Sequence, residues 1–119
     1  MQTTKKKGDN WELIAIKYLQ NIWYSILDCN FKFWRFWEID IIAKQDNIIC
    51  FIEVKYRTNI RYWVWEESIT KNKLFKLKKS IDYYVLINNL NYENIRFDVI
   101  SILKMSDKYR LKHYKNLEI

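Results

Sequence analysis

Three charged residues, Asp40, Glu53 and Lys55, lie within two otherwise apolar runs of the chain. Asp40 stands between Ile39 and Ile41, and the other two follow a run of five apolar residues that begins at position 48. Charged side chains are rarely buried unless they are paired or bound to a metal ion. Because two carboxylates can share one cation, these residue types indicate a site.

The two runs are predicted to form a β-hairpin whose turn is centred on Asp46 and Asn47. In that register the numbers of opposed residues sum to about 93, so Asp40 faces Glu53. Opposed side chains lie roughly 5 Å apart at Cβ, and Lys55, two residues beyond Glu53, projects from the same face. A slip of one residue would separate the two carboxylates, so the inference depends on the turn.

The elements that must position these residues alternate in a pattern typical of an α/β domain, with about five strands in a mixed sheet flanked by helices. Asp9 or Asn10 is expected to cap the first helix and Ser68 the second. The second helix would cross over and place the next strand beside the hairpin. Residues 1–8 are expected to form a basic flexible tail and residues 9–119 a single domain. The predicted elements are helices over 11–21 and 68–88, and strands over 24–33, 36–43, 48–56, 95–103 and 109–114.

Glu12 lies on the apolar face of the first predicted helix, together with Ala15, Ile16 and Leu19. A carboxylate in the first turn of a helix can simply interact favourably with the helix dipole. An inward-facing Glu12 can also serve as a third carboxylate of a metal site. The residues alone leave both interpretations open.

The composition favours a polyanionic partner. The 119 residues carry a formal net charge of +7 with a pI near 9.4, which is typical of small nucleic-acid-binding domains, although a basic surface can also serve solubility alone. No apolar run approaches the roughly 20 residues of a membrane span, and no apolar signal core follows the basic start. We therefore expect a cytoplasmic protein with no membrane partner, whose Cys29 and Cys50 are reduced core thiols.

Several basic residues are candidates for phosphate contact. Arg57 and Arg61 lie near the end of the second hairpin strand. One face of the second predicted helix carries a row of lysines, which can bind phosphates or simply be solvated: Lys71, Lys73, Lys76, Lys78 and Lys79. Elsewhere, Arg96 and Asp98 are predicted to form a structural ion pair, and His113 to be a surface residue.

The chain resembles the YraN family of small proteins, within the restriction-endonuclease-like or PD-(D/E)XK superfamily, and its layout is similar to that of archaeal Holliday-junction resolvases. The resemblance spans about residues 8–103. It rests on Glu12, Glu-Ile-Asp at 38–40, Phe-Ile-Glu-Val-Lys-Tyr-Arg at 51–57, Glu-Ser-Ile at 67–69 and Arg-Phe-Asp-Val-Ile at 96–100. It implies a restriction-endonuclease-like fold and a phosphodiesterase that depends on Mg²⁺ or Mn²⁺.

The resemblance also implies a role for each motif residue. Asp40, Glu53 and the backbone carbonyl of Val54 would bind the metal ion. Lys55 would orient or activate the attacking water and offset charge on the phosphate. Glu12 would complete the metal sphere, as in the resolvase-like branch.

Glu38 shares a strand face with Asp40, so it is either a further ligand or a group that supports the ligands. The expected function is that of a Mg²⁺-dependent endonuclease acting on nucleic acid, DNA rather than RNA, with selectivity for substrate structure. The resolvase-like relatives also make a homodimer a candidate assembly. Three alternatives stay open: a nuclease fold that binds without cutting, a protein-binding module that uses the aromatic residues 62–65, and a salt-bridged hairpin.

One departure from the family pattern concerns glycine. The chain has one Gly and six Trp, whereas average usage of about 7% predicts roughly eight Gly. Tryptophan stands where the pattern has glycine at Trp11, Trp23 and Trp37, and at Trp63 or Trp65. We hypothesise that these positions are encoded by UGA codons that the source organism reads as glycine. A tryptophan at position 37 would crowd the entrance to the site.

Overall fold

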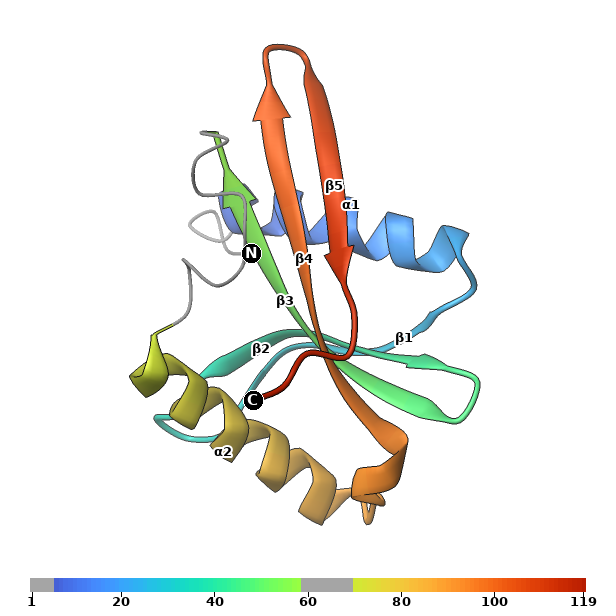
Figure 1. Cartoon of the computed structure of the whole chain (residues 1–119), viewed down its shortest axis with the longest axis vertical. Helices are drawn as coiled ribbons and strands as arrows, with labels where there is room; N and C mark the ends of the chain where they lie inside the picture. The colour runs from blue at the N-terminus through green and yellow to red at the C-terminus, as the bar shows by residue number, and fades with distance from the viewer. Residues whose placement is uncertain (1–5, 59–69) are drawn as a thin grey trace.

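The computed structural model describes residues 6–58 and 70–119, which form an α/β arrangement with a five-stranded mixed sheet (Figure 1). The order of the helices and strands, α-β-β-β-α-β-β, is the predicted one. The elements are α1 (Lys6–Asn21), β1 (Ser25–Lys32), β2 (Glu38–Gln45), β3 (Ile48–Arg57), α2 (Lys71–Ile87), the 3₁₀ turn η4 (Tyr92–Asn94), β4 (Ile95–Met105) and β5 (Lys108–Tyr114).

The strands lie in the sheet in sequence order, β1 to β5. Neighbouring strands are antiparallel except β3 and β4, which are parallel because α2 carries the chain across between them. This confirms the expected crossover. The central strand β3 has a partner on each side and buries residues 49–53 in an unbroken run. The central strand of the sheet is therefore apolar, and its buried segment ends at a charged residue, Glu53.

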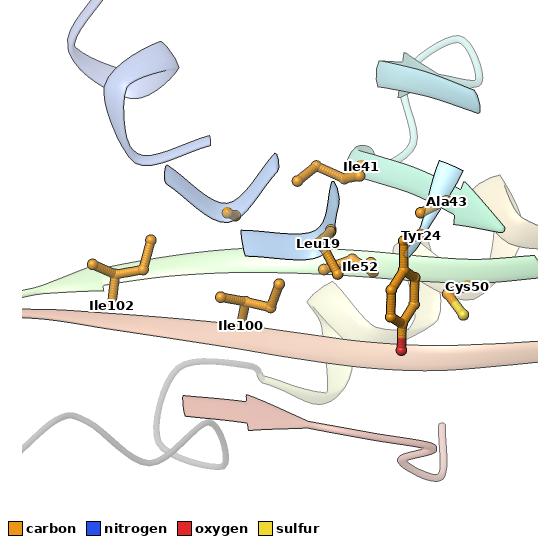
Figure 2. Packing of buried hydrophobic residues seen from close by; sticks show 9 residues of the cluster. Leu19, Tyr24, Ile41, Ala43, Cys50, Ile52, Ile100 and Ile102 are labelled. Carbon is orange, nitrogen blue, oxygen red and sulfur yellow. The ribbon is translucent and has the colours of Figure 1, made fainter. Parts of the chain in front are cut away.

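One hydrophobic core lies between the sheet and α1. Ala15 and Leu19 of α1 are fully buried in this core. Figure 2 shows Leu19 beside Ile52 of β3. Cys50 belongs to this core and is a free thiol, as predicted. Cys29 is also a free thiol, but the prediction that it lies in the core is wrong: it is exposed on β1, the edge strand of the sheet formed by the described residues.

A second core lies on the opposite face, between the sheet and α2. The predicted apolar stripe of α2 buries Leu77, Ile81 and Val85 against a face that includes Ile42 and Phe51. Because strand side chains alternate, positions 53 and 55 of β3 belong to the same face as position 51. The hairpin charges therefore lie on the α2 side. Neither helix in the described part of the chain is long and apolar enough to cross a membrane.

The starts of both helices differ from prediction. α1 begins before Asp9 and Asn10, so both lie within the helix and neither caps it. α2 is capped by Thr70, whose hydroxyl accepts a hydrogen bond from the Lys73 amide at 3.2 Å. Ser68, the predicted cap, lies outside the described residues. A cap two residues later in sequence leaves the apolar stripe in place, because burial of the stripe and not the cap sets the helix orientation.

Asp98 of β4 is fully buried on the α1 side, where it accepts hydrogen bonds from three residues. Arg96 donates to both carboxylate oxygens, at 3.0 and 2.9 Å, which confirms the predicted pair. The Asn116 amide donates at 2.9 Å, and Nε2 of His113 lies 2.7 Å away. His113 also meets the Tyr18 hydroxyl and its side chain is only 4% exposed, so the prediction of a surface histidine is wrong.

Burial alone would raise the pKa of Asp98, but hydrogen bonds from His113, Arg96 and the Asn116 amide outweigh it and lower the pKa below the usual value. An acid whose pKa is lower in the folded state contributes stability above its unfolded pKa. That contribution is lost as the pH falls through the folded pKa.

We predict that Asp98→Asn lowers the free energy of unfolding by about 2–3 kcal/mol at neutral pH, because Arg96 loses a charged acceptor. The difference from the unmodified protein should shrink as the pH falls below about 4. Denaturant unfolding at several pH values measures it. Asp107→Asn, in the exposed β4–β5 turn, is the control and should change little. A difference that does not vary with pH would contradict this role of Asp98.

Candidate functional site

The β2–β3 hairpin has the predicted register. All five residue pairs between the strands, from Ile41 with Ile52 to Gln45 with Ile48, sum to 93. Asp46 and Asn47 form the turn, and Asp46 adopts a left-handed backbone (φ 55°) that aspartate tolerates. The next step of the ladder sets Asp40 opposite Glu53. The two carboxyl groups are therefore close enough to interact electrostatically.

Asp40 is half-buried and fixed by the backbone of the facing strand. Its Oδ2 atom accepts a hydrogen bond from the Val54 amide at 2.8 Å. Glu53 is more deeply placed, with 2% of its surface exposed. The hairpin therefore offers one carboxylate near the surface and one in the interior, on the same face of the sheet.

Burial raises the pKa of Glu53 well above its usual value. The neighbouring carboxyl group of Asp40 raises this pKa further, whereas Lys55 and the indole of Trp37 act in the opposite direction. Two carboxyl groups this close cannot both ionise without a compensating positive charge. A divalent cation is chemically suited to provide that charge.

The carboxylates lie in an open cleft of about 520 Å³. Its lining combines Asp40, Glu53 and the predicted Glu38 with four cationic side chains from different elements: Lys32, Arg35, Lys55 and Lys76. Lys32 ends β1, Arg35 lies in the β1–β2 loop, and Lys76 comes from α2. An acidic centre surrounded by cations is suited to a phosphate group held over a metal ion.

Trp37 closes part of this cleft. Its indole N–H donates a hydrogen bond to the Oε2 atom of Glu53. Its backbone carbonyl accepts a hydrogen bond from the Ser80 hydroxyl of α2. The ammonium groups of Lys55 and Lys73 lie 5.8 and 5.4 Å from the centre of its ring. The predicted crowding of the site by this side chain is therefore observed.

Glu12 does not join the cleft. α1 covers the other face of the sheet, and both carboxylate oxygens of Glu12 lie 3.2 Å from the amide nitrogen of Asn30 on β1. Among residues 6–58 and 70–119, no three His, Cys, Asp or Glu side chains are grouped so that they could hold a metal ion. The structure thus brings together Asp40, Glu53, Lys55 and Glu38, and leaves Glu12 apart.

The residues predicted to contact nucleic acid differ in their distance from the cleft. Arg57 donates to the carbonyl of Tyr56, the residue before it, and does not line the cleft. Lys71 is exposed at the start of α2, and Lys73 lies over Trp37. Arg61 lies outside the described residues, as does the aromatic segment 62–65. Their roles stay predictions.

Lys32 and Arg35 were missed by the sequence reasoning. They line the cleft although they precede the motif by several residues. A signal was present, because Lys32 and Arg35 are interleaved with the aromatic residues Phe31, Phe33 and Phe36. Such interleaving is a feature of surfaces that bind single-stranded nucleic acid.

Comparisons with known proteins assign the family. A family model described as "Uncharacterised protein family UPF0102" matches residues 11–102. A UPF0102 protein of Sulfurihydrogenibium sp. (strain YO3AOP1) is 40% identical over 113 residues, which are 95% of this chain and 96% of that protein. A UPF0102 protein of Clostridioides difficile (strain 630) is 40% identical over 112 residues, 94% and 96% of the two chains. One of Flavobacterium psychrophilum is 35% identical over 109 residues, 92% and 90% of the two chains.

These matches cover the hairpin, both helices and the crossover strand, which are the elements that build the cleft. The chain belongs to the UPF0102 family, the family of the YraN proteins.

Proposed function

We propose that the chain is a metal-dependent phosphodiesterase that cleaves nucleic acid, with DNA as its substrate. The observation that carries this proposal is the pair of opposed carboxylates, Asp40 and Glu53, beside Lys55 in a cleft surrounded by cations. The resemblance of the motif to the restriction-endonuclease-like superfamily supports the same function. The formal net charge of +7 is suited to a polyanionic substrate.

The residues of the cleft fit Mg²⁺ or Mn²⁺. Both ions prefer oxygen ligands, and Mg²⁺ is usually held by one or two carboxylates together with water and substrate phosphate. Asp40 and Glu53 would supply those carboxylates, with the Val54 carbonyl as the third protein ligand that the resemblance implies. When bound, the ion polarises the phosphate and lowers the pKa of a bound water.

The other side chains of the cleft would act on the substrate directly. The Lys55 ammonium would orient the attacking water and offset negative charge on the scissile phosphate. Lys32, Arg35 and Lys76 would bind neighbouring phosphates from the two sides of the cleft, because they come from the β1–β2 region and from α2. Glu38 would accept hydrogen bonds from water in the same cleft.

A second candidate function is nucleic-acid binding without cleavage. It is favoured by Trp37, whose indole N–H donates to Glu53 and so competes with a metal ion for the same carboxylate. The salt-bridged hairpin has less support. In the described part of the chain, Lys55 forms no ion pair with either Asp40 or Glu53.

A cleavage assay tests the proposed activity. With Mg²⁺ or Mn²⁺, the protein should cut at least one of branched, single-stranded and duplex DNA, and Asp40→Asn should reduce the rate on the order of 100-fold or more. Loss of a ligand carboxylate removes several kcal/mol of charge stabilisation in the transition state. Lys44→Gln, at the exposed far end of β2, is a control that should keep full activity.

Equal cleavage by Asp40→Asn and the unmodified protein would reject the site. Tight binding of all three DNA substrates by the native protein, with no cleavage under either metal, would favour the binding function instead.

A further prediction concerns the salt dependence of binding. Replacing Lys32, Arg35 and Lys76 together by Gln should weaken DNA binding. The slope of log K against log [salt] should also fall by about 0.9 for each duplex phosphate that the variant no longer neutralises. Fluorescence anisotropy at several salt concentrations measures both.

The matched control removes the same number of positive charges from the exposed β4–β5 hairpin. In it, Gln replaces Lys104, Lys108 and Arg110. This triple variant should keep the original slope. The same reduction of slope in both triple variants would show that net charge, and not the cleft, determines binding.

A further inference from the structure

Two tryptophans have backbone conformations that favour glycine. Trp23 has φ 73° and Trp34 has φ 52°. Residues other than glycine are uncommon in this left-handed region, because Cβ is crowded there, and Asn and Asp are the usual exceptions. The other non-glycine residues with positive φ in the described chain are small and polar: Asn30, Asp46, Asn89, Ser106 and Asn116. The two bulky aromatic residues differ from all of these.

Trp23 ends α1 in a Schellman motif. The Trp23 amide donates to the carbonyl of Gln20 at 3.2 Å, and the Tyr24 amide donates to the carbonyl of Leu19 at 3.0 Å. This pattern puts Trp23 at the left-handed position after the helix, which is usually glycine and sometimes asparagine. Leu19 and Tyr24 make the accompanying apolar contact within the α1 core (Figure 2).

α2 provides an internal comparison, because it ends in the same motif. The Asn89 amide donates to Leu86 at 3.2 Å, and the Leu90 amide donates to Val85 at 3.0 Å. Here the left-handed position is Asn89, with φ 54°. The same fold thus uses an ordinary residue at one helix end and tryptophan at the other.

Trp34 occupies a second type of glycine position. The Phe36 amide donates to the carbonyl of Phe33 at 2.9 Å, which closes a four-residue turn with Trp34 as its first central residue. Only that central residue has positive φ, as in a type II′ turn, whose first central position is dominated by glycine.

Burial gives no reason for tryptophan at either place, although the guanidinium of the neighbouring Arg35 lies 5.1 Å from the centre of the Trp34 ring. Trp23 is 89% exposed and Trp34 is 71% exposed. A large apolar side chain is normally retained because it buries surface, and these two bury little. Pooling the one Gly with the six Trp gives seven, close to the roughly eight glycines expected from average usage.

We infer that the natural polypeptide carries glycine at positions 23, 34 and 37, from UGA codons read as glycine, and that glycine at 37 opens the cleft over Asp40 and Glu53. The backbone carries the inference at 23 and 34, and position 34 is new relative to the family pattern. At position 37 the inference rests on the proposed function. Without the indole, Oε2 of Glu53 loses its donor and the space beside Lys55 and Lys73 becomes available to a cation and a phosphate.

The decisive test is peptide mass spectrometry of the protein purified from its source organism, across residues 18–44. We expect a mass lower by the difference between tryptophan and glycine at each of the three positions. A tryptophan mass at 23 or 34 overturns the inference. This measurement does not depend on any activity of the protein.

Variants of the tryptophan-bearing chain test the backbone argument. Trp23→Gly and Trp34→Gly should unfold at a higher temperature than Trp23→Ala and Trp34→Ala, because only Cβ distinguishes each pair. Trp11, which lies inside α1 and has no positive φ, is the control. There the alanine variant should unfold at a higher temperature than the glycine variant. Alanine variants at 23 and 34 that unfold at a higher temperature than the glycine variants would contradict the inference.

Titration with Mn²⁺ tests position 37. Trp37→Gly should bind Mn²⁺ about tenfold or more tightly than the tryptophan-bearing chain, and the gain should vanish when Asp40→Ala is added. No gain would overturn the inference at this position. Tight Mn²⁺ binding without DNA cleavage would count against the proposed nuclease and leave the glycine assignment intact.

Discussion

The register of one hairpin determines the rest of the site. The two-residue turn at Asp46 and Asn47 fixes which residues of β2 and β3 face each other, and so sets Asp40 against Glu53. The parallel strand β4 pairs with the other edge of β3, and α2 covers the face from which both carboxylates project. A slip of one residue would move one carboxylate to the α1 side, where there is an apolar core. The cleft, its charge and its closure by Trp37 all follow from that pairing.

Two buried carboxylates in adjacent strands show how differently such groups can be used. Asp98 faces α1, accepts hydrogen bonds from three residues and has a lowered pKa. Glu53 faces α2, lies against another carboxylate and has a raised pKa. The first is a satisfied structural group whose donors connect β4, β5 and the chain beyond them. The second is poorly compensated by the protein alone, which supports the proposal that it belongs to a functional site.

Most of the fold could be predicted from the sequence, because strand and helix periodicity, the two-residue turn and the crossover are local signals. The predictions that failed depend on tertiary contacts. His113 lies on an edge strand but is covered by Tyr18 and Asp98, which come from distant parts of the chain. Glu12 lies on the predicted apolar face, yet α1 is placed so that its carboxylate accepts a hydrogen bond from the side chain of Asn30. The glycine-like position of Trp34 could not be recognised from the sequence, because only its positive φ angle reveals it.

The most direct measurement of the proposed metal site is an anomalous-difference map from crystals of the Trp37→Gly variant grown with Mn²⁺. We expect a Mn²⁺ peak in the cleft beside Asp40 and Glu53, the two residues that would hold the ion. A peak elsewhere on the protein, or none in a cleft that is otherwise open, would contradict the assignment of these two residues as metal ligands.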